Sequence, residues 1–181
     1  FAPYVMKYVK LVVHGSCVIS QMDMIEYKHA QTPRMLEFTQ QESMEDDTLK
    51  QIYLGALESY RSNALDVFMD CPSRERAGWL CDSFFTARVE HVLTGETKIE
   101  KAFLDNFLMV EEFPHLPKGM LPMCYPADHN DGLFIPNWAM WFVLELEEYL
   151  GRSGDSELIQ RAKKRVYDLL DYFKPFENEF G

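Results

Sequence analysis

From about residue 46 onward, the apolar residues recur with the period of amphipathic α-helices rather than strands. Five residues at helical spacing make up the first stripe: Leu49, Ile52, Tyr53, Ala56 and Tyr60. Asp46 or Asp47 can cap the start of this helix, which is predicted to end near residues 63–65. Four more helices are predicted over residues 79–93, 97–111, 137–150 and 155–174. An all-α structure is therefore expected beyond residue 46.

The connections between these helices alternate in length. Short turns are predicted at Thr94-Gly95 and over residues 151–154, with Gly151 ending the fourth helix. Long connections are predicted around residues 70–78 and over residues 113–136. This alternation is typical of a ring of helical hairpins with its long loops on one rim, where loops of such length are usually functional.

The first thirty residues have a different pattern. Residues 4–13 are rich in β-branched and aromatic side chains, and two shorter runs follow the turn at Gly15-Ser16. Two or three strands cannot stand alone, so we interpret them as the end of a β-domain followed by a polar linker. The chain starts without methionine and stops just past a helix, and we therefore expect it to be a segment of a longer protein.

Composition excludes several kinds of partner. The net charge of −11 disfavours nucleic acids and anionic membranes, and no apolar run approaches the ~20 residues of a membrane-spanning helix. Aromatic residues make up 14% of the chain, which suits either sugar binding or a large core. The four cysteines match no zinc spacing and are expected to be free thiols: Cys17, Cys71, Cys81 and Cys124.

The segment from Asp70 to Asp82 carries the strongest functional signal. It combines three carboxylates, two arginines and Trp79, and it is interrupted by Pro72 and Gly78, so most of it is predicted to be a loop. Apolar residues on both sides favour a partly buried site over a wet turn. From these residues alone, an arginine–carboxylate network that pins the helices is the favoured explanation.

Other candidate positions have ordinary explanations. His115, His129 and the neighbouring aspartates do not have a diagnostic metal spacing, so no metal or cofactor is predicted. Trp141 and Phe142 are assigned to the core, and Trp138 either packs in the core or stacks on a sugar. Three glutamates of the fourth predicted helix are interpreted as a solvated face: Glu145, Glu147 and Glu148.

Residues 70–82 resemble the D-C-P-x-R-E-R-x-G-W-x-x-D pattern of bacterial α-L-rhamnosidases, glycoside hydrolase family 78. Nine positions match without a gap: Asp70, Cys71, Pro72, Arg74, Glu75, Arg76, Gly78, Trp79 and Asp82. Weaker likeness extends to residues 1–13, Asn63 and Asn137-Trp138. The resemblance implies a mainly α fold. Residues 1–40 would end a β-sandwich domain and linker, and residues 41–181 would form the first half of an (α/α)6 catalytic toroid.

The resemblance also implies roles for single residues. Glu75 corresponds to the general acid that protonates the glycosidic oxygen. The rhamnose-binding positions correspond to Asp70, Arg74, Trp79 and Asp82, with Trp138 as a further candidate. Cys81 departs from the family, which often has glycine before the final aspartate, and the larger side chain could shift Asp82. The general base is a glutamate of the second half of the toroid, and no residue of this chain is assigned to it.

Two functions follow from the resemblance. The first is an inverting exo-α-L-rhamnosidase that removes terminal rhamnose from glycans or glycosides, and the second is a non-catalytic relative that binds the sugar but lacks a base. Either one has a carbohydrate partner and needs no cofactor. The bacterial relatives favour a periplasmic or secreted location over the cytoplasm.

Overall fold

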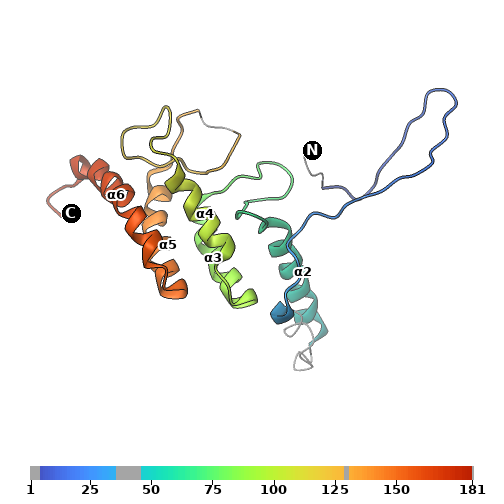
Figure 1. Ribbon diagram of the computed structural model, residues 1–181, viewed down its shortest axis with the longest axis horizontal. Coiled ribbons are helices and arrows are strands. Elements are labelled where there is room, and N and C mark those ends of the chain that lie inside the picture. The colour runs from blue at the N-terminus through green and yellow to red at the C-terminus, as the bar shows by residue number, and fades with distance from the viewer. Residues whose placement is uncertain (1–4, 36–45, 129–130, 181) are drawn as a thin grey trace.

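The computed structural model describes residues 5–35, 46–128 and 131–180, and the regular structure in these residues is helical (Figure 1). The elements follow the order α2 (Asp47–Asn63), α3 (Leu80–Thr94), α4 (Lys98–Met109), α5 (Pro136–Ser153), α6 (Ser156–Phe173) and the 3₁₀ turn η1 (Lys174–Phe176). The prediction of a mainly α fold is confirmed. None of the helices described is both long and apolar enough to cross a membrane.

The ends of the helices follow the capping signals of the sequence. The Asp46 side chain accepts hydrogen bonds from the backbone N–H groups of Thr48 and Leu49, which starts α2. Gly95 ends α3 in the left-handed conformation. The predicted end of α5 at Gly151 was wrong, because the helix continues to Ser153 and Gly154 is the residue with a left-handed φ, of 70°.

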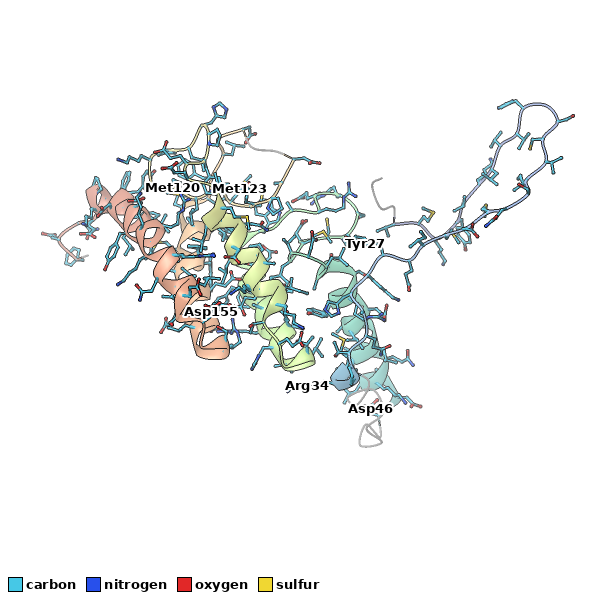
Figure 2. The ribbon with its side chains drawn as sticks, viewed as in Figure 1. Tyr27, Arg34, Asp46, Met120, Met123 and Asp155 are labelled. Carbon is cyan, nitrogen blue, oxygen red and sulfur yellow. The ribbon has the colours of Figure 1, made fainter. Side chains whose placement is uncertain are left out.

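Helices α3 and α4 form one hairpin and α5 and α6 form another (Figure 1). Both short turns lie at one end of the bundle, and both long connections lie at the other end. Figure 2 shows this separation through Met120 and Met123, which lie in the long loop at the end opposite Asp155. The predicted alternation of short and long connections therefore produces one rim of loops.

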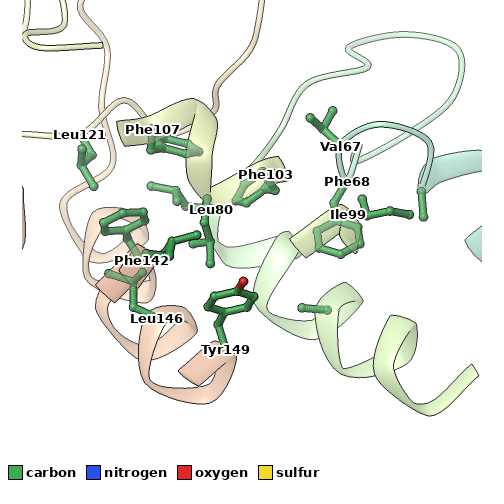
Figure 3. Close-up of a cluster of buried hydrophobic side chains, with 14 of the residues drawn as sticks. Val67, Phe68, Leu80, Ile99, Phe103, Phe107, Leu121, Phe142, Leu146 and Tyr149 are labelled. Carbon is green, nitrogen blue, oxygen red and sulfur yellow. The ribbon is translucent and has the colours of Figure 1, made fainter. Parts of the chain in front are cut away.

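The hydrophobic core lies between the two hairpins and below the loops (Figure 3). Its largest fully buried side chains include Phe103, Phe107, Phe142 and Tyr149. Phe107 joins the helices to the long loop, because its ring centroid lies 5.8 Å from those of both Phe142 and Tyr125. Aromatic contacts of this kind typically add ~0.5–1.5 kcal/mol beyond burial of area, so the loop is held firmly on the bundle.

The predicted apolar face of α2 is only partly buried. Tyr60 is buried, but Leu49 and Ile52 remain 56% and 62% exposed. Leu57, which the predicted stripe omitted, is buried. The helical period was correct, but the period alone cannot say which part of a stripe meets a neighbour: Tyr53 packs against the core, whereas the described residues leave Leu49 and Ile52 largely exposed.

The amino-terminal segment differs from its prediction. No strand occurs within the described residues 5–35, and the apolar side chains of residues 5–27 are largely exposed in extended chain. A strand exists only through hydrogen bonds to a partner strand, and this segment has none in the described structure. The chain meets the bundle at His29, whose N–H donates to the carbonyl of Arg61 at 2.7 Å. The prediction of strands in this segment was therefore wrong for residues 5–35.

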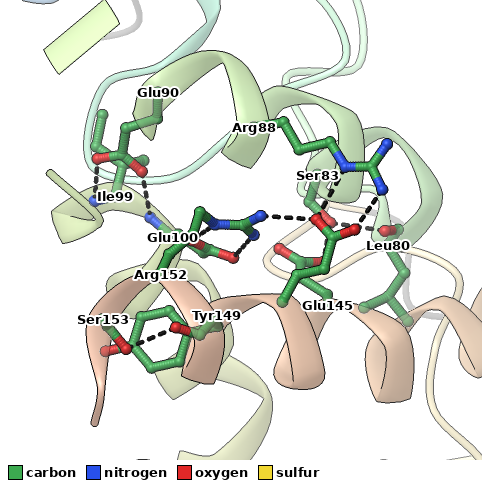
Figure 4. A network of polar contacts seen from close by, with 11 residues as sticks. Leu80, Ser83, Arg88, Glu90, Ile99, Glu100, Glu145, Tyr149, Arg152 and Ser153 are labelled. Carbon is green, nitrogen blue, oxygen red and sulfur yellow. Dashed lines mark hydrogen bonds and ion pairs between the residues drawn. The ribbon is translucent and has the colours of Figure 1, made fainter. Parts of the chain in front are cut away.

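A polar network lies between α3, α4 and α5 (Figure 4). Arg152 of α5 donates to both oxygens of the fully buried Glu100 and, at 2.6 Å, to Glu148. Arg88 of α3 also pairs with Glu148, and the two arginines lower the pKa of Glu148 to about 2. The prediction of a solvated glutamate face was wrong for Glu145, which is fully buried, because hydropathy cannot detect the partners that allow a carboxyl group to enter the core.

Glu90 of α3 caps the neighbouring helix α4. Its two carboxylate oxygens accept the backbone N–H groups of Ile99 and Glu100 at 2.9 and 3.0 Å, so it satisfies two of the free donors at the helix start. Within the described part of the chain, Thr97 at the N-cap position makes no side-chain capping bond. Burial raises the pKa of Glu90 to about 7, although the two backbone hydrogen bonds oppose this shift.

This raised pKa predicts that the protein loses stability as the pH rises. A carboxyl group whose pKa is higher in the folded state stabilises the protein fully below its unfolded pKa, and this contribution is lost between the unfolded and folded values. For Glu90 the window runs from the ordinary value of 4.5 to about 7, and the loss is of order 3 kcal/mol. Urea unfolding across this window should give a falling free energy for the wild type and a flatter profile for Glu90→Gln. Identical pH profiles of the unfolding free energy in the wild type and Glu90→Gln would contradict the raised pKa of Glu90.

Candidate active site

The segment that carries the candidate residues is a loop closed on itself at the rim between α2 and α3. The N–H of Met69 donates to the carbonyl of Asn63 at 2.8 Å, at the end of α2. The N–H of Asp70 donates to the carbonyl of Ala77, and the N–H of Ala77 donates to Asp70 Oδ1 at 3.0 Å. Asp70 therefore fixes the base of the loop, and residues 71–76 project from it.

The second long loop packs against this segment. The carbonyl of Gly78 accepts a hydrogen bond from the N–H of Tyr125 at 2.8 Å, and the N–H of Gly78 donates to the carbonyl of Pro126 at 3.2 Å. Next to it, Trp79 forms a β-bridge with Cys124. Gly78 must be glycine because an added Cβ would lie 2.4 Å from the Tyr125 carbonyl oxygen and 2.9 Å from the Phe103 ring. The close approach of these two loops thus depends on the absence of a side chain.

Replacing Gly78 with alanine should destabilise the protein by about 3 kcal/mol, since overpacking against backbone atoms forces the chain to move. Gly55 offers a matched control, because it lies in α2 and its added Cβ would meet nothing within 4 Å. Gly55→Ala should leave stability unchanged or raise it by up to about 1 kcal/mol. Urea unfolding of the two variants measures the difference, and equal effects would show that the loop contact is not tight.

Glu75 is held by three contacts. Its backbone N–H donates to Cys71 Sγ at 3.3 Å, and its Oε2 accepts the indole N–H of Trp79 at 3.1 Å. Its Oε1 pairs with Arg74, whose side chain is 82% exposed, whereas that of Glu75 is 26% exposed. Arg76 then turns the chain with a left-handed φ of 50°. The Glu75 carboxylate is thus held on one side by the Trp79 indole. On the other side it contacts the solvent-exposed guanidinium of Arg74.

Two further aspartates lie within electrostatic reach. Partial burial raises the pKa of Asp82, a hydrogen bond at its own backbone lowers it, and the charges of Asp70 and Glu75 raise it further. Asp82 sits in the first turn of α3, where the helix dipole favours negative charge, and much of its surface is exposed. The charges of Asp70 and Glu75 therefore both act on Asp82.

Cys124 of the long loop adjoins the same group. Burial raises the pKa of its thiol to about 11, and the charges of Asp70, Glu75 and Asp131 add to this shift. The sequence placed Cys71 in the motif but gave it no contact, whereas its Sγ accepts the Glu75 N–H, and it did not indicate that Cys124 lies within electrostatic reach of the carboxylates. The four-residue spacing from Cys71 to Glu75 was a usable local signal, but nothing in the sequence pointed to Cys124.

The predicted site residues are thus distributed as follows. Asp70, Glu75, Trp79 and Asp82 are connected through hydrogen bonds or charge interactions. Trp138 lies in the first turn of α5, where its ring packs against the core and its indole N–H is buried with no hydrogen-bond partner among the described residues. The contacts of Trp138 therefore correspond to the packing role, and its role in sugar binding stays a prediction.

Two cavities of the structure lie away from this segment. One of about 260 Å³ is formed by the end of α4 and α6, and an apolar groove of about 460 Å³ lies between α5 and α6. Neither of these two cavities is lined by residues 70–82. Within residues 5–35, 46–128 and 131–180, no three His, Cys, Asp or Glu side chains are grouped to hold a metal ion; His129 lies outside these ranges.

Comparisons with known proteins agree with the fold. The family described as bacterial alpha-L-rhamnosidase 6 hairpin glycosidase domain matches residues 39–179. The crystal structure of a GH78 family rhamnosidase of Bacillus sp. GL1 superposes with a TM-score of 0.64 and 24% sequence identity, covering 75% of this chain and 14% of that chain. A search of curated proteins returned no match. The chain therefore belongs to the family of the bacterial α-L-rhamnosidase six-hairpin glycosidase domain.

Proposed function

We propose that this chain supplies the general acid and part of the sugar site of an inverting exo-α-L-rhamnosidase. The observation that carries the proposal is the placement of Glu75, whose carboxylate is held by the Trp79 indole within electrostatic reach of Asp82. An acid positioned beside groups that can hold sugar hydroxyls is the arrangement that glycoside hydrolysis needs. The family membership and the fold of the rhamnosidase relative support it.

The hydrogen bonds of Glu75 suggest which oxygen delivers the proton. Oε2 is occupied by the Trp79 N–H, whereas Oε1 faces the exposed guanidinium of Arg74. A general acid must carry its proton on an oxygen that the leaving group can reach. Oε1 is that oxygen in our proposal, and Arg74 moves away when the sugar binds. A surface ion pair of this kind contributes little energy, so the movement is inexpensive.

The aspartates are assigned to the sugar. Carboxylate oxygens accept hydrogen bonds from hydroxyl groups, and Asp82 presents its carboxylate at the exposed start of α3. Asp70 already uses Oδ1 for the Ala77 N–H, so it contributes to sugar binding through Oδ2. Trp79 offers an aromatic face for the apolar side of the sugar ring. Arg74 lies beside the same site.

The general base is proposed to come from a part of the enzyme outside this chain. An inverting mechanism places the base ~6.5–9.5 Å from the acid, with a water molecule between them. Residues 41–181 would be the first half of the catalytic toroid, and residues 1–40 would be the end of a β-domain and a linker. The chain spans 14% of the rhamnosidase that it superposes on, so the activity concerns the complete enzyme.

The complete protein should hydrolyse an aryl α-L-rhamnoside and release β-L-rhamnose first, since displacement by water inverts the anomeric carbon. Proton NMR of the first turnovers distinguishes the two anomers. Release of the α-anomer would contradict inversion. Binding of L-rhamnose without hydrolysis would favour the non-catalytic relative, and absence of both would refute a rhamnose site.

A further inference from the structure

The hydroxyl group of Ser83, in the first turn of α3, makes two short contacts with oxygen atoms. Its Oγ lies 2.6 Å from the carbonyl oxygen of Leu80 and 2.6 Å from Oε2 of Glu145 on α5, and the side chains of Ser83 and Glu145 are fully buried. A hydroxyl has one hydrogen, and a carbonyl oxygen has none to donate. Two short O···O contacts require two hydrogens, so the second one must belong to Glu145.

The charges around Glu145 agree with a neutral side chain. The cations that approach from α3 and α5 are Arg88 and Arg152, and their guanidinium groups bind Glu148 and Glu100. Oε1 of Glu145 is buried without a hydrogen-bond partner among the described residues. An ionised carboxylate left in this state would be costly, whereas a neutral acid is tolerated.

On balance, the groups that shift the pKa of Glu145 also favour its neutral form. Burial raises the pKa of Glu145 well above its ordinary value, and the charges of Glu100 and Glu148 raise it further. The hydrogen bond with Ser83 and the charge of Arg152 lower it. Among these groups, Glu100 comes from α4, Ser83 from α3, and Glu148 and Arg152 from α5 itself (Figure 4).

We propose that Glu145 is held as a neutral carboxylic acid that donates to Ser83, and that this bond positions the first turn of α3. Ser83 donates through Oγ to Leu80, and its backbone N–H donates to the carbonyl of Trp79 at 3.0 Å. Asp82 immediately precedes Ser83 on the same turn. Glu145 is therefore a positioning residue for Trp79 and Asp82, and its link to sugar binding rests on the proposed function above.

Infrared difference spectroscopy tests the protonation state without any ligand. The complete protein is compared with Glu145→Gln at a pH above the titration of Glu90, where that carboxyl group is ionised. The C=O stretching band of a protonated carboxylic acid should be present in the wild type and absent in Glu145→Gln. Glu147→Gln, an exposed neighbour on α5, should keep the band. A wild-type spectrum without the band would overturn the neutral acid.

L-Rhamnose binding to the complete protein tests the positioning role. Glu145→Gln should bind like the wild type, because its amide can donate to Ser83, whereas Glu145→Leu should bind on the order of 10-fold more weakly. A purely structural role would lower thermal stability in Glu145→Leu but leave the affinity of the folded protein unchanged, which would overturn the positioning.

The two proposals fail in different ways. If the wild type has no affinity for L-rhamnose, the proposed function fails, while hydrogen exchange of the Trp79 indole N–H still decides the positioning. Because this N–H donates to Glu75, its protection should fall in Glu145→Leu and persist in Glu145→Gln. Equal protection in both variants would refute the positioning independently of any sugar.

Discussion

Glu75→Gln in the complete enzyme is expected to lower kcat/KM by ~10²–10⁴-fold for rhamnosides with poor leaving groups, the usual contribution of general acid catalysis. Glutamine keeps the shape and can still accept the Trp79 N–H, but it has no transferable proton. The loss should be small for an activated aryl rhamnoside, because its phenolate departs without protonation. Steady-state kinetics on both substrate types measure this difference.

Asp70→Asn is the matched control for this experiment. Asparagine preserves the hydrogen bond from the Ala77 N–H through its amide oxygen, so the loop remains closed. It removes a charged contact to the sugar ring that both substrates share, and both rates should therefore fall by a similar factor. If Glu75→Gln also reduced both rates equally, Glu75 would be a binding or structural residue and the acid would have to be another carboxylate.

Arg152→Leu is expected to destabilise the protein by about 3–5 kcal/mol, because it leaves Glu100 buried without its cation. Burial already raises the pKa of Glu100 even with Arg152 present. Without the arginine, the carboxyl group can escape ionisation by taking up a proton, which costs more as the pH rises. Urea unfolding should therefore show a penalty that is larger at alkaline than at acidic pH.

Arg161→Leu provides the comparison, because Arg161 pairs with Asp105 at the surface with half of its side chain exposed. A surface pair of this kind is worth at most about 1 kcal/mol. If Arg161→Leu and Arg152→Leu cost the same, burial of Glu100 would not be the cause of the larger effect.

The helical part of the fold was predictable because its determinants are local. Periodicity located the helices, and residues such as Asp46 and Gly95 set their ends through capping geometry. The errors arose where distant parts of the chain decide the outcome. The exposure of Leu49 depends on which surface lies opposite α2, and the burial of Glu145 depends on Ser83, sixty-two positions away along the chain.

The candidate site divides in the same way. The contact between Glu75 and Trp79 could be expected because both residues belong to one short segment. The bridge from Trp79 to Cys124 could not, because it forms only when the second long loop folds back over Gly78. Loop length and its proline and glycine content indicated a functional loop, but not the point at which it touches the motif.

The most direct measurement is a crystal structure of the complete protein with L-rhamnose bound. We predict that the sugar lies at the rim formed by residues 70–82, with its hydroxyl groups on Asp70 and Asp82. The anomeric oxygen should then lie within hydrogen-bond distance of Glu75, about 2.6–3.2 Å. A rhamnose molecule bound elsewhere, or one whose anomeric oxygen points away from Glu75, would contradict the assignment of this segment as the acid half of a rhamnosidase site.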